Sequence, residues 1–200
     1  MAWYIVLGVI VLAIAYVFYN YFRIKKMNEG TADMADMAKI IRDGATTFMK
    51  TEYKTIAIVV VVVALVFTLF VEATSGITFL MGACMSSIVC VLGMRSATYA
   101  NVRTANKARE TLSIGETVKV ALCGGSISGL SVQAFGLLGL LLVVLFGGID
   151  KDAVSTGLLA NLECNPSIMR ITTYSLGCSL VAMFNRVAGG NYTKAADISS

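Results

Sequence analysis

Long apolar runs, separated by short charged segments, dominate the sequence. About 20 apolar residues in a helix cross roughly 30 Å of hydrocarbon, and the two shortest of these runs approach that length. The five runs are Ala2–Phe22, Thr55–Val71, Ile77–Met94, Val120–Gly147 and Ile168–Arg186. Among the charged residues, only Arg170 and Arg186 fall inside a run, each near an end. The pattern predicts an all-α, polytopic transmembrane helical bundle that forms a single membrane domain over residues 1–200.

Two of the runs have another interpretation that must be weighed. The second is rich in β-branched residues around Val59–Val63, which would suggest a buried strand in a soluble protein. A lone strand in lipid leaves its backbone groups unpaired, so we predict a helix there. The first run occupies the position of a signal peptide, but no basic residue precedes it and its apolar stretch is long. We therefore expect a retained helix.

Composition supports the membrane assignment. Hydrophobic residues make up 57% of the chain and charged residues only 14%, whereas a soluble domain carries about a quarter charged residues. The absence of histidine excludes any mechanism that needs a histidine base, nucleophile or metal ligand. The net charge of +4 is modest, so the placement of the charges matters more than their number.

The basic residues alternate between the segments that connect the runs. Lys and Arg concentrate after the first and third runs, are absent from residues 72–76, and are represented only by Lys151 between the fourth and fifth. The concentrated set is Arg23, Lys25, Lys26, Lys39, Arg42, Lys50, Lys54, Arg95, Arg103, Lys107, Arg109 and Lys119. Because cytoplasmic segments retain Lys and Arg, we predict that the N-terminus lies outside and the C-terminal segment in the cytoplasm.

The basic segments carry local helix signals of their own. In the first, apolar residues recur at helical spacing, with Thr31 or Asp33 as a candidate cap. These apolar residues are Met34, Met37, Ala38, Ile41, Ala45 and Phe48. Such a stripe lies on a lipid surface or packs on the bundle, and we favour packing. In the second basic segment, Ser113 and Glu116 have the spacing of a capping box.

The small residues of the fourth run suggest helix packing. Residues 124–129 are glycine-rich but lack the Gly-Lys-Ser/Thr ending of a phosphate-binding loop. Gly125 and Gly129 form a Gly-x-x-x-Gly spacing, which allows two helices to approach closely, and we expect Gln133 to face the bundle interior. The five cysteines fit neither a zinc site nor a disulfide framework, so we expect structural roles for them.

The segment from Arg186 to Asp197 offers candidate chemistry. An arginine at the end of a membrane span is a functional candidate, because charge there is costly. Lys194 and Asp197 are three residues apart and share one face of a helix. The two form either a simple ion pair or half of a phosphate–metal site, with lysine on a phosphate oxygen and aspartate on Mg²⁺. The residues alone favour the ion pair, since no further carboxylate follows.

The stretch Arg-Val-Ala-Gly-Gly-Asn-Tyr-Thr-Lys-Ala-Ala-Asp over residues 186–197 resembles the signature of the membrane-integral, ion-pumping inorganic pyrophosphatases. It differs from the family pattern at Ala188, where glycine is usual. Four further segments resemble that family in the same order. They are residues 41–54, 93–103, 124–140 and 176–179.

The resemblance implies a homodimeric, Mg²⁺-dependent hydrolase that cleaves pyrophosphate at the cytoplasmic face and exports H⁺, Na⁺ or both, with K⁺ as a candidate activator. It implies that Lys194 contacts pyrophosphate, Asp197 helps to hold Mg²⁺, and Arg186 belongs to the gate that couples hydrolysis to ion movement. The resemblance places no water-activating catalytic residue in this chain. A prokaryotic cell membrane is the expected location, and no nucleic-acid partner is expected.

We expect the chain to be the N-terminal part of such a pump and to be inactive alone, because a partial metal site does not neutralise the substrate. Two alternatives stay open. One is a non-enzymatic helical channel or scaffold in which Lys194 and Asp197 are merely structural, and the other is part of a secondary transporter, since glycine-interrupted spans also occur there.

Overall fold

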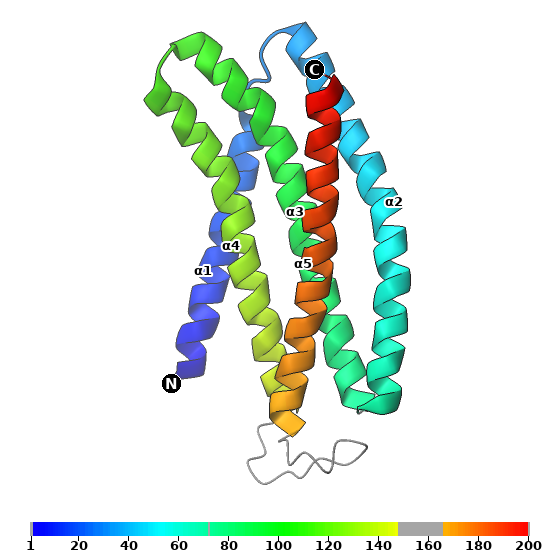
Figure 1. Cartoon of the computed structure of the whole chain (residues 1–200). Coiled ribbons are helices and arrows are strands. Elements are labelled where there is room, and N and C mark those ends of the chain that lie inside the picture. The colour runs from blue at the N-terminus through cyan, green and yellow to red at the C-terminus, as the bar shows by residue number, and fades with distance from the viewer. Residues whose placement is uncertain (1, 72, 148–165, 200) are drawn as a thin grey trace. The chain divides into compact units, whose positions relative to one another are not determined.

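The computed structural model describes residues 2–71, 73–147 and 166–199 and shows helices throughout, without a strand in these ranges. In chain order the helices are α1 (Ala2–Lys26), α2 (Ala32–Phe70), α3 (Ala73–Thr111), α4 (Ile114–Gly147) and α5 (Pro166–Ser199) (Figure 1). All five are long and apolar enough to cross a membrane. The predicted all-α architecture with five spans is therefore confirmed, whereas the orientation of the N-terminus stays a prediction.

The helices extend well beyond the apolar runs that predicted them. The stripe of the first basic segment is not a separate helix, because α2 begins at Ala32 and continues without a break through the second run. Ala38 and Ala45 are buried, as packing requires, but Met37 is 60% exposed. Likewise α3 continues from the third run to Thr111. Most of the basic residues between the runs therefore lie on helical extensions and not in loops.

The connection between α3 and α4 is very short. It consists of Leu112, whose φ of 48° is left-handed, and Ser113. The predicted helix start at Ser113 is confirmed, since the Thr117 backbone N–H donates to the Ser113 carbonyl at 3.2 Å. Glu116 does not complete a capping box there; its carboxylate pairs with Lys119 at 2.7 Å.

The chain divides into two compact units. The first comprises residues 1–51 and 89–135, and the second comprises residues 52–88 and 136–200. Helices α2, α3 and α4 each contribute one part to either unit, whereas α1 belongs to the first and α5 to the second.

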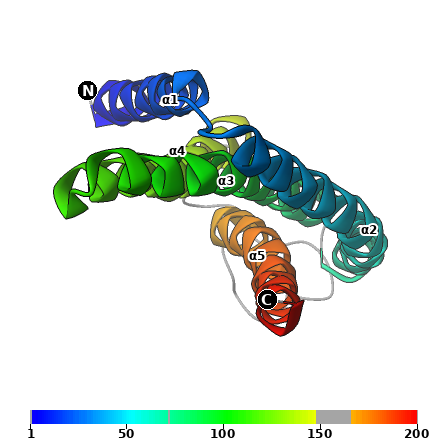
Figure 2. The ribbon, with the colours of Figure 1, turned by 90° about the horizontal axis from the view of Figure 1, so that it is seen from above.

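In the first unit α1 packs alongside α3 and α4 (Figure 2). One buried cluster there consists of Val17 and Ile24 from α1, Ala100 from α3 and Ile127 from α4. Polar contacts join the same helices. Asn20 donates to the Ser126 hydroxyl at 3.1 Å, and the buried Ser96 hydroxyl donates to the Gly124 carbonyl at 3.0 Å.

The second unit has its own core and a close helix crossing. One cluster of its buried apolar residues comes from α2, α3 and α5, and it consists of Ile56, Val60, Ala64, Phe79, Ala83 and Val181. At the crossing of α3 and α5, a Cβ added to Gly82 would collide with the Tyr174 carbonyl, and one added to Gly177 would collide with the Phe79 carbonyl. Two glycines thus let the helix backbones touch, as small residues do in membrane bundles.

The glycines singled out in α4 do not make such a contact within the described residues. Gly125 and Gly129 are exposed and have open space where a Cβ would project. The close approach is made one residue earlier, where a Cβ on Gly124 would meet Ala100 at 2.5 Å. Gln133 is exposed as well, so the expectation that it faces the interior is wrong for this part of the chain. Consecutive residues of a helix point in directions roughly 100° apart. The spacing of small residues alone does not show which of them faces the neighbouring helix.

Candidate functional site

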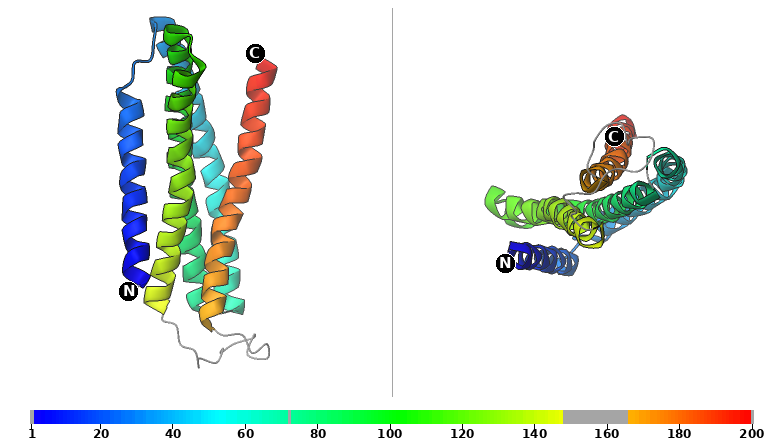
Figure 3. Two further views of the ribbon diagram at one scale, coloured as in Figure 1. Left: turned by 90° about the vertical axis from the view of Figure 1, so that its left-hand side faces the viewer. Right: turned by 90° about the horizontal axis from the view of Figure 1, so that it is seen from below.

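The predicted site residues lie on the last turns of α5, which is one unbroken helix up to Ser199 (Figure 3). Ideal helix geometry places Arg186 and Asp197 roughly 20° apart around the axis and about 16 Å apart along it. Lys194 lies about 60° from Asp197 and one turn before it. The three residues therefore occupy one side of α5, as the sequence prediction requires.

The end of α5 presents free polar groups. Arg186 and Lys194 are exposed, and neither side chain forms a hydrogen bond or ion pair within the described residues. Asp197 belongs to the helix, but its side chain lies outside the described set, so its pairing with Lys194 stays a prediction. Both cations thus lack a partner among the described side chains.

The packed part of α5 ends close to these residues. Phe184 packs against the core of the second unit, and Ala188 is still buried. Beyond it Gly190, Asn191 and Lys194 are exposed. A rigid, packed helix therefore carries the polar turns, which fixes the spacing of their backbones along the axis.

The residues of α5 can supply only part of a metal site. Asp197 is the one carboxylate in the α5 sequence, and no group of three or more metal-binding side chains occurs among the described residues. Mg²⁺ is commonly held by one or two carboxylates together with substrate phosphate oxygens and water. A single aspartate beside a lysine fits a contribution to such a site but not a complete one.

The first unit contains a partly buried ionic cluster that sequence reasoning did not identify. Arg103 of α3 is only 4% exposed and donates to the backbone carbonyls at the end of α1. Its Nε binds the Met27 carbonyl at 3.0 Å, and its other nitrogens bind the carbonyls of Lys25 at 3.3 Å and Tyr99 at 2.8 Å. Arg103 thereby satisfies carbonyl groups that a helix end leaves without partners.

Glu29 completes this cluster from the segment between α1 and α2. Its carboxylate accepts two hydrogen bonds from Arg42, at 2.7 and 3.1 Å, and one from Arg103 at 2.9 Å. Both guanidinium groups also lie over the Tyr99 ring, 5.2 and 5.4 Å from its centroid. The hydrogen bonds from Arg42, and then the positive charges of both arginines, lower the pKa of Glu29 below its ordinary value.

A sequence signal for this cluster existed but was weak. Ser96, Ala100, Arg103 and Asn106 recur at helical spacing, and all four are buried. A hydropathy pattern does not reveal such a stripe, because three of its members are polar. Glu29 lies outside any helix, so no periodicity marks it.

The sequence of this chain is similar to a known protein family and to several of its members. The family model described as inorganic H⁺ pyrophosphatase matches residues 11–200. A K⁺-stimulated pyrophosphate-energized sodium pump of Thermotoga maritima is 43% identical over 186 residues, which is 90% of this chain and 26% of that protein. A K⁺-insensitive pyrophosphate-energized proton pump of Methanosarcina mazei is 33% identical over 180 residues, or 88% of this chain and 24% of that protein.

A further relative matches the chain with similar identity and coverage. The K⁺-insensitive pyrophosphate-energized proton pump 2 of Moorella thermoacetica is 32% identical over 95% of this chain. The chain spans about a quarter of the length of these curated relatives. The family match runs from the middle of α1 through the end of α5 and confirms the resemblance drawn from the sequence. The chain belongs to the inorganic H⁺ pyrophosphatase family.

Proposed function

We propose that this chain forms the substrate-facing N-terminal part of a pyrophosphate-energised ion pump. The observation that carries the proposal is the end of α5, where Arg186, Lys194 and Asp197 share one side of a rigid helix and the two cations have no partner among the described residues. Pyrophosphate is a compact polyanion, and its hydrolysis requires mainly positioning and neutralisation of charge. A lysine next to an aspartate offers both.

In this proposal Lys194 binds a phosphate oxygen of pyrophosphate through its ammonium group. Asp197 contributes one oxygen ligand to Mg²⁺, which neutralises substrate charge when it is bound. The rest of the metal site and the residue that activates water would come from outside this chain. The 200 residues alone are then expected not to hydrolyse pyrophosphate, and Mg²⁺-dependent hydrolysis by them would contradict this division of the site.

Arg186 has a different role in the proposal. It lies eight residues before Lys194, about 12 Å along the helix axis. A guanidinium at that distance from a site that gains and loses several charges feels the change electrostatically, especially near the end of a membrane span. We therefore assign Arg186 to the gate that couples hydrolysis to ion movement.

The proposed pump is a homodimer in a prokaryotic cell membrane, with its pyrophosphate site on the cytoplasmic side. Its relatives include a K⁺-stimulated sodium pump and K⁺-insensitive proton pumps, so H⁺ and Na⁺ are both candidates for the transported ion and K⁺ is a candidate activator. Measurements must therefore record both ions, with and without K⁺.

The proposal is tested in a chimaera. This chain replaces the aligned N-terminal quarter of the Thermotoga maritima pump, and the chimaera is reconstituted in vesicles. We expect Mg²⁺-dependent pyrophosphate hydrolysis. Lys194→Ala should lower kcat/KM about 10- to 100-fold, because a charged hydrogen bond contributes about 1.5–3 kcal/mol. Asp197→Asn should raise the Mg²⁺ concentration needed for half-maximal activity.

The controls separate the site from general surface charge. Lys39→Ala removes another exposed lysine and should leave kcat/KM unchanged. Arg186→Lys should leave hydrolysis measurable while reducing the number of ions moved per pyrophosphate, whereas Arg95→Lys, on an exposed arginine of α3, should change neither. Equal effects of the Lys194 and Lys39 variants would contradict the assignment of the substrate site.

A further inference from the structure

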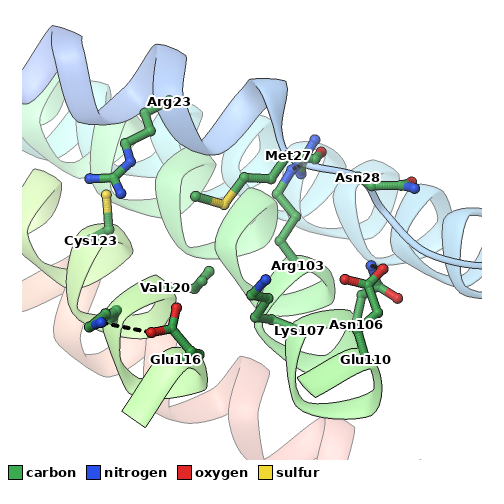
Figure 4. Close-up of a pocket in the computed structure, with 11 residues that line it drawn as sticks. Arg23, Met27, Asn28, Arg103, Asn106, Lys107, Glu110, Glu116, Val120 and Cys123 are labelled. Carbon is green, nitrogen blue, oxygen red and sulfur yellow. Dashed lines mark hydrogen bonds and ion pairs between the residues drawn. The ribbon is translucent and has the colours of Figure 1, made fainter. Parts of the chain in front are cut away.

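A second site lies in the first unit, away from the α5 residues in sequence. A pocket of about 320 Å³ opens between the end of α1, the end of α3 and the start of α4 (Figure 4). It is lined by both polar and apolar groups. The charged and polar lining consists of Arg23, Asn28, Arg103, Asn106, Lys107, Glu110, Glu116 and Lys119, and the apolar lining of Met27, Val120 and Cys123.

Some of the charged side chains that line the pocket have partners, and others have none among the described residues. Glu116 pairs with Lys119, and Glu110 accepts a hydrogen bond from Asn106 at 2.9 Å. Arg103 is balanced by Glu29. Arg23 and Lys107, in contrast, form no ion pair or side-chain hydrogen bond within the described residues.

These two cations come from different helices. Figure 4 shows Arg23 extending from α1 beside Cys123, and Lys107 rising from α3 toward the same hollow. Glu110 keeps its negative charge, because the Asn106 amide is neutral. With Glu116 paired to Lys119 and Arg103 to Glu29, Arg23 and Lys107 still outnumber Glu110, so the pocket has an excess of positive charge and room for an anion. A phosphate group suits it, since its oxygens accept hydrogen bonds from several cationic groups at once.

The position of the pocket along the helices identifies the source of the phosphate. Arg23 directly follows the first apolar run, and Val120 is the first residue of the fourth. The pocket thus lies where apolar spans give way to charged helix ends, with Met27, Val120 and Cys123 available to the first carbons of a chain. Basic pockets between membrane helices at this depth bind anionic lipid headgroups.

We propose that this pocket binds the phosphate group of an anionic phospholipid, held by Arg23 and Lys107. The site is independent of the proposed pyrophosphate chemistry, because none of its lining residues belongs to α5. The bound lipid would bridge α1 and α3, in addition to the hydrogen bonds that Arg103 makes between them.

The test compares lipid retention by the full chain purified in mild detergent. Native mass spectrometry measures binding of phosphatidylglycerol against zwitterionic phosphatidylcholine. We expect the wild type to retain phosphatidylglycerol, and Arg23→Gln combined with Lys107→Gln to weaken it at least 10-fold. The matched control, Lys25→Gln combined with Lys26→Gln, removes the same charge from exposed positions of the same helix end that do not line the pocket.

A conservative variant and a local reporter complete the experiment. Arg23→Lys combined with Lys107→Arg keeps both charges and should keep the lipid. In a chain whose other cysteines are alanine, phosphatidylglycerol should slow the reaction of Cys123 with a neutral maleimide, and the glutamine double variant should lose this protection.

Three outcomes would overturn the proposal. Equal loss of lipid in the Arg23/Lys107 and Lys25/Lys26 variants would show that general surface charge, and not the pocket, retains the lipid. An absence of preference for phosphatidylglycerol over phosphatidylcholine in the wild type would exclude a headgroup site. Protection of Cys123 by millimolar inorganic phosphate, without any effect of phosphatidylglycerol, would assign the pocket to a free anion.

Discussion

At the scale of single residues, Arg103 makes the contacts that hold the end of α1 to α3. One guanidinium group satisfies two carbonyls at the end of α1, those of Lys25 and of Met27 just after the helix, together with one carbonyl of its own helix and the Glu29 carboxylate. A buried arginine is costly without such partners, and here each side of its planar fork is occupied. The cluster therefore depends on the shape of arginine as well as on its charge.

Replacing Arg103 with methionine should destabilise the chain by about 2–4 kcal/mol, because the α1 carbonyls and one side of Glu29 lose their donor. Arg103→Lys should give an intermediate loss, since one ammonium cannot reach all four acceptors. Thermal unfolding in detergent measures both changes. Arg95→Met, at an exposed position of the same helix, is the control; an equal shift for Arg95 and Arg103 would contradict the buried role.

Glu29 predicts a dependence of stability on pH. Its pKa in the folded state lies below the ordinary value of 4.5, chiefly because Arg42 donates hydrogen bonds to its carboxylate. The ionised group therefore stabilises the fold fully above pH 4.5, and this contribution is lost as the pH falls through the folded pKa. The difference in unfolding temperature between wild type and Glu29→Gln should be largest near pH 6 and shrink below pH 4.5. A constant difference across this range would contradict the assignment.

At the scale of the elements, the apolar runs predicted five helices correctly but not their lengths. Hydropathy marks where a helix can lie in lipid, whereas the helices also continue through polar residues without a breaker, as α2 does from Ala32 into the second run. The single proline begins α5, a position that tolerates its missing N–H. For the candidate site, sequence resemblance located Lys194 and Arg186, but it could not show that both side chains are exposed, because exposure depends on the packing of other elements.

The crossing of α3 and α5 predicts a contrast between glycines. Gly177→Ala should destabilise the chain by about 1–3 kcal/mol, because its Cβ would meet the Phe79 carbonyl and push the backbones apart. Gly125→Ala should be neutral or should stabilise by up to about 1 kcal/mol, because its Cβ projects into open space and alanine favours the helix. Thermal unfolding of both variants tests this contrast, and Gly8→Ala is a control at a second glycine with open space around its Cβ position. Destabilisation by Gly125→Ala would reveal a contact on that face of α4.

At the scale of the whole chain, the family assignment and the helices leave the direction of insertion to be established. The charges make a definite prediction, because the basic residues gather at the end of α1, along the first half of α2, and around the connection between α3 and α4. The structure sharpens this pattern by placing most of these residues on helical extensions, so the charge is held on rigid helices close to the spans. The two ends of α3 must therefore lie on opposite sides of the membrane if this helix crosses it, with the basic end inside.

This prediction is tested with one reporter at each end of α3, in a chain whose native cysteines are alanine. Ala73→Cys lies at the start of the helix, where no Lys or Arg is near in the sequence, and Ser113→Cys follows its basic end. A membrane-impermeant maleimide added to intact cells should label only the Ala73 variant, and the same reagent added to inverted vesicles should label only the Ser113 variant. Both variants replace small side chains at helix ends, so neither should disturb packing. The reverse labelling would place the end of α5 outside the cell, away from cytoplasmic pyrophosphate, and would contradict the proposed pump together with the topology.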